Sequence, residues 1–118
     1  MAQPRPAAAF LPLTHLTYYL LLVLTDGPAH GLALVDRIRA RSGDLVNPGT
    51  GSFYSIVQKT VGQGLIAEEP AESGGRKRAY QLTPLGRRVL AAEAARLAAL
   101  TGETRKALAR PARQPSRS

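Results

Sequence analysis

A run of polar side chains around residue 55 carries the first chemical signal in this sequence. Its members are Ser52, Tyr54, Ser55, Gln58 and Lys59. Hydroxyl and amide groups on a helix can hydrogen-bond to base edges in the major groove of DNA, and a lysine can neutralise phosphate. A merely solvated helix face carries the same residue types, so this signal needs support from elsewhere in the chain.

A second cluster, Arg76, Lys77 and Arg78, follows the glycine-containing segment 71–75. Cationic side chains at the tip of a β-ribbon can reach phosphates or the minor groove beside a helix. The whole chain holds 16 Lys and Arg against 8 Asp and Glu, a net charge of +8. Such a positive net charge favours binding to a polyanion, either nucleic acid or an anionic membrane surface.

Metal binding and catalysis find little support in the sequence. His15 and His30 are isolated from other residues at ligand spacing. Ser52 and Ser55 belong to no established nucleophile motif, and the glycines before them lack the Gly-Lys-Ser/Thr ending of a phosphate loop. We therefore expect no enzyme activity, no metal and no cofactor.

The composition also bears on the compartment. The chain has no cysteine, and residues 1–10 lack the charged and apolar regions of an export signal. The most apolar stretch, residues 16–24, is shorter than the roughly 20 residues of a membrane-spanning helix. We expect a cytoplasmic protein in which this stretch is a buried helix.

Hydrophobic spacing predicts three helices in the first half of the chain. The first is capped by Thr14 and runs to about residue 25; it is apolar nearly all round, so it is either wholly internal or shared between its own domain and a partner subunit. The second covers residues 30–41, and 44–47 is a possible short strand. The third begins at the N-cap Ser52 and ends near residue 63, with its apolar residues on one arc and the polar run on the other.

Two strands and a last helix complete the pattern. Residues 65–70 and 76–82 read as the strands of a hairpin, and Thr83 with Pro84 begins a helix that Thr101 and Gly102 interrupt. The predicted fold is mainly α with a small β-hairpin: a winged helix-turn-helix plus a C-terminal helix. Its parts are a flexible N-terminal tail over 1–12, the winged helix-turn-helix over 13–82, the C-terminal helix region over 83–109 and a disordered basic tail over 110–118.

Three sequence blocks resemble the PadR family across residues 13–100. The first is the aliphatic helix 20–25 followed by Asp-Gly-Pro-Ala-His-Gly at 26–31. The second is Gly-Ser-Phe-Tyr at 51–54 with Gly-Leu-Ile at 64–66, similar to the start and exit of the family's recognition helix. The third joins Gly75 and Arg76 to Tyr-Gln-Leu-Thr-Pro-Leu-Gly-Arg at 80–87. The chain departs from the family at Leu32, where tyrosine is usual, and at residues 59–61.

The resemblance implies a homodimer, joined through the first and last helices, that binds a pseudo-palindromic double-stranded DNA operator and usually represses transcription. The interface residues it suggests are Leu16, Tyr19, Leu20, Val89, Leu97 and Leu100. It also implies release by a small hydrophobic or aromatic effector, with Tyr18, Tyr19 and Leu97 as pocket residues unless they are ordinary core. Two other classes stay open: a winged-helix module that binds a protein, and a basic membrane-surface protein.

Overall fold

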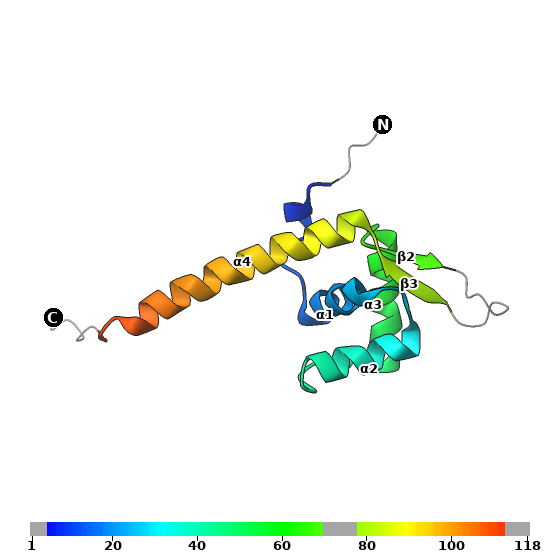
Figure 1. Cartoon of the computed structure of the whole chain (residues 1–118), viewed down its shortest axis with the longest axis horizontal. Helices are drawn as coiled ribbons and strands as arrows, with labels where there is room; N and C mark the ends of the chain where they lie inside the picture. The colour runs from blue at the N-terminus through cyan, green and yellow to red at the C-terminus, as the bar shows by residue number, and fades with distance from the viewer. Residues whose placement is uncertain (1–4, 70–77, 113–118) are drawn as a thin grey trace.

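The structure is a computed structural model, and it describes residues 5–69 and 78–112. Its elements are η1 (Ala7–Phe10), α1 (His15–Val23), η2 (Leu24–Asp26), β1 (Ala29–His30), α2 (Gly31–Arg41), α3 (Thr50–Gly62), β2 (Ile66–Glu69), β3 (Ala79–Leu82) and α4 (Pro84–Ala109). Figure 1 shows α1, α2 and α3 gathered beside the first half of α4, with the strands at one end. This arrangement confirms the winged helix-turn-helix with an added C-terminal helix.

The strands form a three-stranded antiparallel sheet in the order β1-β3-β2. On one side of the central strand β3, Ile66 of β2 pairs with Leu82 and Glu68 pairs with Tyr80. On the other side of β3, Ala29 of β1 pairs with Tyr80. The sequence predicts the hairpin but not β1, because two residues are too few to show alternation. The possible strand at 44–47 is wrong, because the chain turns there, with a positive φ of 65° at Asp44. The Val46 amide donates a hydrogen bond to the Ser42 hydroxyl at 3.0 Å, which holds this turn.

The core lies where α1, α2, α3, the sheet and the first half of α4 meet. Its fully buried side chains include Leu20, Leu21, Leu34, Ile38, Phe53, Val57, Leu65, Ile66 and Val89. Each element thus contributes an apolar face, which is what a helix or strand must bury to be stable in a small domain. The polar face of α3 is left on the outside. No helix within residues 5–69 and 78–112 is long and apolar enough to cross a bilayer.

The helix boundaries confirm some predicted caps and correct others. Thr14 accepts a hydrogen bond from the Thr17 amide at 3.2 Å, and Thr83 accepts one from the Gly86 amide at 2.9 Å. The predicted N-cap at Ser52 is wrong, because α3 begins at Thr50 with Gly49 as its cap. Ser52 therefore lies in the first turn of the helix.

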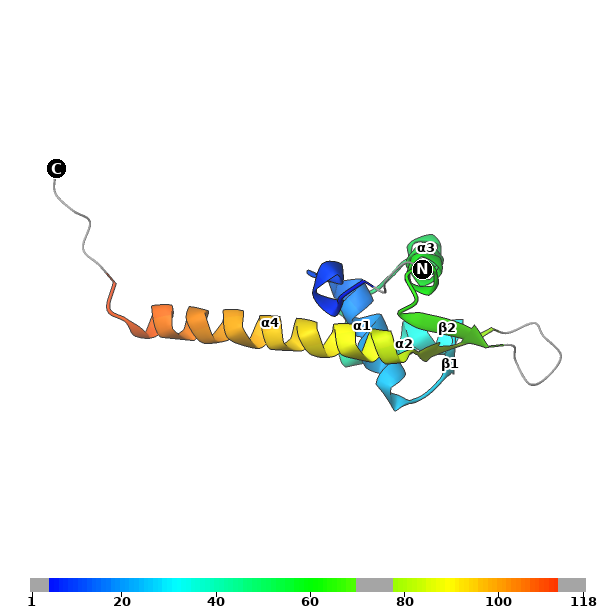
Figure 2. The same ribbon diagram turned by 90° about the horizontal axis from the view of Figure 1, so that it is seen from above.

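Helix α4 does not break at Thr101 and Gly102 as the sequence predicts. It runs unbroken over 26 residues to Ala109, and Figure 2 shows its second half continuing well beyond α1 and η1. A single glycine costs a helix only about 1 kcal/mol. The alanines, leucines and charged residues on both sides of Gly102 are strong helix formers that offset this cost.

Within the predicted flexible tail over 1–12, the described residues 5–12 include a short helical turn and side chains packed on the core. Residues 7–10 form η1, and Phe10, Leu11 and Leu13 pack against the core. The amide of Leu13 donates to the Glu93 carboxylate at 2.6 Å, which ties this segment to α4. The apolar residues at 10, 11 and 13 of this proline-rich stretch follow neither a helical nor a strand period, so the sequence did not reveal this packing.

Candidate nucleic-acid interface

Helix α3 has a sharply divided surface. Phe53, Val57 and Thr60 are buried, and the Thr60 hydroxyl donates to the Ile56 carbonyl at 2.6 Å. Ser52, Tyr54, Ser55, Gln58 and Lys59 are all exposed, so the structure brings the predicted polar residues together on one face. A helix held by one face and polar on the other is able to enter a DNA groove.

The C-terminal end of α3 is fixed to α4 through Thr83. Gly64, with a φ of 79°, ends α3 in a Schellman motif in which the Leu65 amide donates to the Thr60 carbonyl at 3.2 Å. The Thr83 hydroxyl lies 2.7 Å from the Gly64 carbonyl and 2.9 Å from that of Leu65. The polar helix and the long C-terminal helix are therefore joined by direct hydrogen bonds.

Gly86 allows this close approach. A Cβ atom at this position would lie 2.0 Å from the Leu65 carbonyl oxygen, well inside any real contact distance. Only a residue without a side chain fits where α4 crosses the turn after α3. The sequence offered Gly86 as part of a family block, but its steric role became visible only in the structure.

Tyr54 lies at the edge of the polar face, close to α2. Its ring packs edge-on against Phe53, with centroids 5.4 Å apart. The position that a Cβ at Gly31 would take lies 3.2 Å from the Tyr54 hydroxyl oxygen. Tyr54 is still 42% exposed, and it lines a cavity beside the start of α2.

The described part of the predicted wing holds one of its three cations. Arg78 precedes β3, and its Nη1 atom lies 2.6 Å from the Glu68 carboxylate on β2. Arg76 and Lys77 lie outside the described residues. The sequence did not reveal the Glu68 pairing, although cross-strand neighbours of opposite charge are common in hairpins.

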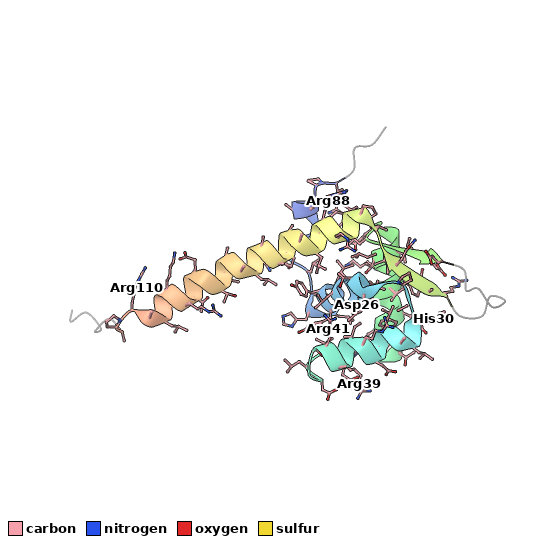
Figure 3. All side chains as sticks on the ribbon, in the orientation of Figure 1. Asp26, His30, Arg39, Arg41, Arg88 and Arg110 are labelled. Atoms are coloured by element: carbon pink, nitrogen blue, oxygen red, sulfur yellow. The ribbon has the colours of Figure 1, made fainter. Side chains whose placement is uncertain are left out.

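A further ion pair steadies the helix-turn-helix itself. Arg41 at the end of α2 lies 3.0 Å from Asp26 in η2, and both side chains are about half exposed. Figure 3 shows the two residues facing each other between α1 and α2, with His30 at the opposite end of α2 beside the strands. An exposed pair of this kind contributes less than about 1 kcal/mol.

The predicted interface residues separate into two groups. Leu20 and Val89 are completely buried in the core of the single chain, so their prediction as interface residues is wrong. Leu16, Tyr19 and Leu97 are partly exposed, and Leu100 is 55% exposed on the second half of α4. The error has a simple cause: helical spacing identifies an apolar face but not whether that face is covered by the same chain.

The predicted effector residues line a common cavity. Tyr18, Tyr19 and Leu97 surround a space of about 320 Å³ between α1, α4 and the segment before α3. The volume lies at the lower end of the range that small-molecule sites occupy. Two interpretations of these residues stay open. They are either the wall of an effector pocket or ordinary, partly covered core residues, because both kinds of residue occupy such positions.

Sequence reasoning missed the polar wall of this cavity, which is Glu93. Its side chain is 1% exposed, and its carboxylate accepts hydrogen bonds from Arg96 and from the Leu13 amide. These bonds, with Arg96 the stronger influence, hold the pKa of Glu93 below its usual range although burial raises it. An acidic residue on the apolar stripe of a helix was the available signal.

Comparison with known proteins places this architecture. Residues 20–92 match the sequence profile of the transcriptional regulator PadR-like family. A PadR family transcription regulator from Clostridium difficile aligns over 80% of this chain and 99% of its own with a TM-score of 0.68 and 20% identity. A transcriptional regulator from Clostridium thermocellum covers 80% of this chain and 92% of its own with a TM-score of 0.67, also at 20% identity.

A curated relative is more similar in sequence. It is an uncharacterized 37.1 kDa protein in transposon TN4556 of Streptomyces fradiae, 39% identical over 82 residues. The match covers 70% of this chain but only 23% of the relative. The chain thus spans about a quarter of that protein's length.

Proposed function

Because the chain belongs to the PadR-like family of transcriptional regulators, which are not enzymes, we propose that it is a homodimeric repressor that binds a pseudo-palindromic operator in double-stranded DNA. The observation that carries the proposal is the divided surface of α3. Its buried side fixes the helix on the core, and its exposed side presents Ser52, Ser55, Gln58 and Lys59 as one polar strip. Such a regulator acts on DNA in the cytoplasm.

We assign different tasks to the exposed residues. Ser52, Ser55 and Gln58 lie on the face that would meet base edges, where an amide or hydroxyl can tell one base pair from another. Lys59, Arg78 and, on the proposal, Arg76 and Lys77 neutralise phosphates, which adds affinity without sequence preference. The net charge of +8 supports binding to a polyanion.

The dimer is proposed from the second half of α4. Leu100 and Leu108 are 55% and 80% exposed there, on a helix that extends beyond the rest of the chain (Figure 1). Two copies that pack these faces together with Leu16 and Tyr19 of α1 would cover them. A two-fold pair of α3 helices then matches a two-fold operator.

A small hydrophobic or aromatic effector is proposed for the cavity beside Tyr18, Tyr19 and Leu97. The cavity touches both α4, which would hold the dimer, and the segment that leads into α3. A ligand that binds one dimer geometry better than another shifts the balance between them. Release from DNA would follow if the favoured geometry places the two α3 helices out of register.

The test is a fluorescence-anisotropy titration with DNA from upstream of the protein's own gene and with a shuffled duplex, at several salt concentrations. We expect tighter binding to the upstream duplex and a steep salt dependence on both. Equal, weak binding to the two duplexes would contradict a sequence-specific regulator.

A further inference from the structure

A second cavity adjoins the exposed polar face of α3, with which it shares Tyr54. It measures about 420 Å³ and is bounded by the start of α2, by α3 and by β3. His30 comes from β1 and Leu32 from the first turn of α2. Tyr54 comes from α3, Tyr80 from β3, and Arg78 is the residue before β3. The cavity therefore separates the proposed recognition helix from the stem of the wing.

The walls of this cavity combine charge with exposed apolar surface. Leu32 is 73% exposed, so its side chain offers apolar surface at one wall of the cavity. The Arg78 side chain is 65% exposed, and its bond to Glu68 uses Nη1, whereas a guanidinium carries five N–H donors. Tyr80, 3% exposed, forms the floor. The site thus offers donors on one wall and an aliphatic contact on the other.

The geometry of DNA determines what would lie over this cavity. In B-DNA the major and minor grooves are separated by a ridge of sugar and phosphate. If α3 enters the major groove and the wing the adjacent minor groove, the ridge between them must pass between α3 and β3. That is the position of the cavity, so the inference rests on the proposed function.

We propose that this cavity seats the sugar-phosphate ridge, with the Tyr54 hydroxyl and Arg78 bound to phosphate oxygens and Leu32 packed on a deoxyribose. Tyr54 is placed for this contact because its ring lies against Phe53 and close to Gly31, which turns its hydroxyl toward α2. Tyr54 accordingly contributes affinity, and base selection is left to Ser52, Ser55 and Gln58. The occupant is DNA because the Arg78 guanidinium complements phosphate and because Tyr54 belongs both to the cavity and to the exposed polar face of α3.

The test removes single groups from both partners. Tyr54→Phe keeps the ring and deletes only the hydroxyl, so it leaves the packing on Phe53 intact. We expect it to weaken binding about 10-fold, equally on the upstream and the shuffled duplex, because hydrogen bonds to charged groups are the stronger ones. Leu32→Ser should weaken both duplexes about 3-fold through lost apolar contact. Arg37→Ala changes an exposed cation of the same helix outside the cavity and is the matched control.

A second measurement locates the phosphate. Operator duplexes carrying one uncharged methylphosphonate at a time are titrated with the wild-type protein and with Tyr54→Phe. At one position in each half-site, the methylphosphonate should lower the affinity of the wild type about 10-fold. The same methylphosphonate should lower the affinity of Tyr54→Phe only slightly further, since that variant has already lost the contact to this phosphate. The Arg37→Ala variant should remain sensitive at that position.

Several outcomes would overturn the inference. A loss confined to the upstream duplex would make Tyr54 a base contact, and full additivity with every methylphosphonate would show that it touches no phosphate. Unchanged binding by Tyr54→Phe and Leu32→Ser would leave the cavity outside the interface. Failure of the proposed function looks different: the wild type would not distinguish the two duplexes, while the losses in these variants would still be measured on both.

Discussion

Gln58 belongs to the exposed strip of α3, and its amide can both donate to and accept from one base. We predict that Gln58→Ala reduces the preference for the operator over shuffled DNA by about 1–3 kcal/mol, the usual worth of a base contact. Competition titrations at fixed salt measure this preference. An equal loss on both duplexes would instead place Gln58 on the backbone.

Glu93 is the residue through which acid should loosen the molecule. Its pKa is lowered from an ordinary 4.5, first by the Arg96 side chain and also by the Leu13 amide. The unfolded chain therefore takes up this proton at a higher pH than the folded chain does. The stability that the carboxylate contributes is present above about pH 4.5 and is lost as the pH falls through the lower folded value.

We predict that the free energy of unfolding, measured by chemical denaturation between pH 7 and pH 3, falls less steeply in Glu93→Gln than in the wild type. Glutamine keeps the shape of the side chain but cannot titrate. Glu103→Gln is the control, since Glu103 lies on the same helix with its side chain 77% exposed. Identical pH profiles for wild type and Glu93→Gln would exclude this role.

For single residues, the sequence predicted which side chains share a helix face, but not which other residues cover or contact them. The polar strip of α3 followed from spacing alone, because a helix turns about 100° per residue. Leu20 and Val89 were misplaced because one stretch of sequence does not say which chain covers an apolar face. The pairing of Arg78 with Glu68 depends on strand register, which no composition reveals.

Two glycines of α4 allow the packing of this helix to be tested. Gly86→Ala forces a Cβ to 2.0 Å from the Leu65 carbonyl, so we predict a loss of about 3 kcal/mol in unfolding free energy from overpacking. Gly102→Ala meets nothing within 4 Å in the chain and should gain about 1 kcal/mol from helix propensity. Thermal unfolding of the pair would contradict this account if both changed stability in the same direction.

The elements themselves were largely predictable, and the failures have physical causes. Thr14 and Thr83 act as the predicted caps because a side-chain oxygen satisfies an otherwise free amide. Ser52 does not, since the helix extends back over Thr50 and Gly51 and leaves Ser52 inside its first turn. Strand β1 has only two residues, and its partners are separated from it by the whole of α2 and α3.

For the whole molecule, the proposed dimer makes a direct prediction. Leu100→Glu adds a charge to an exposed apolar position on the second half of α4, so we expect light scattering to show a shift from dimer to monomer and operator affinity to fall with it. Leu32→Glu makes the same change at a 73% exposed leucine near the other end of the molecule and should leave the mass unchanged. A Leu100→Glu protein that stays dimeric would move the interface away from this face.

The continuity of α4 has a mechanical consequence for the spacing of operators. At 1.5 Å per residue, its 26 residues form a rod of about 39 Å without a hinge at Gly102. Thr83 joins the start of α4 to the turn after α3. In the proposed dimer, the stiff α4 helices would therefore fix the distance between the two α3 helices. Operators lengthened by half a turn of DNA should then be rejected, whereas a jointed helix would tolerate them. The stiffness of α4 thereby limits the half-site spacing of the operators that the proposed dimer can bind.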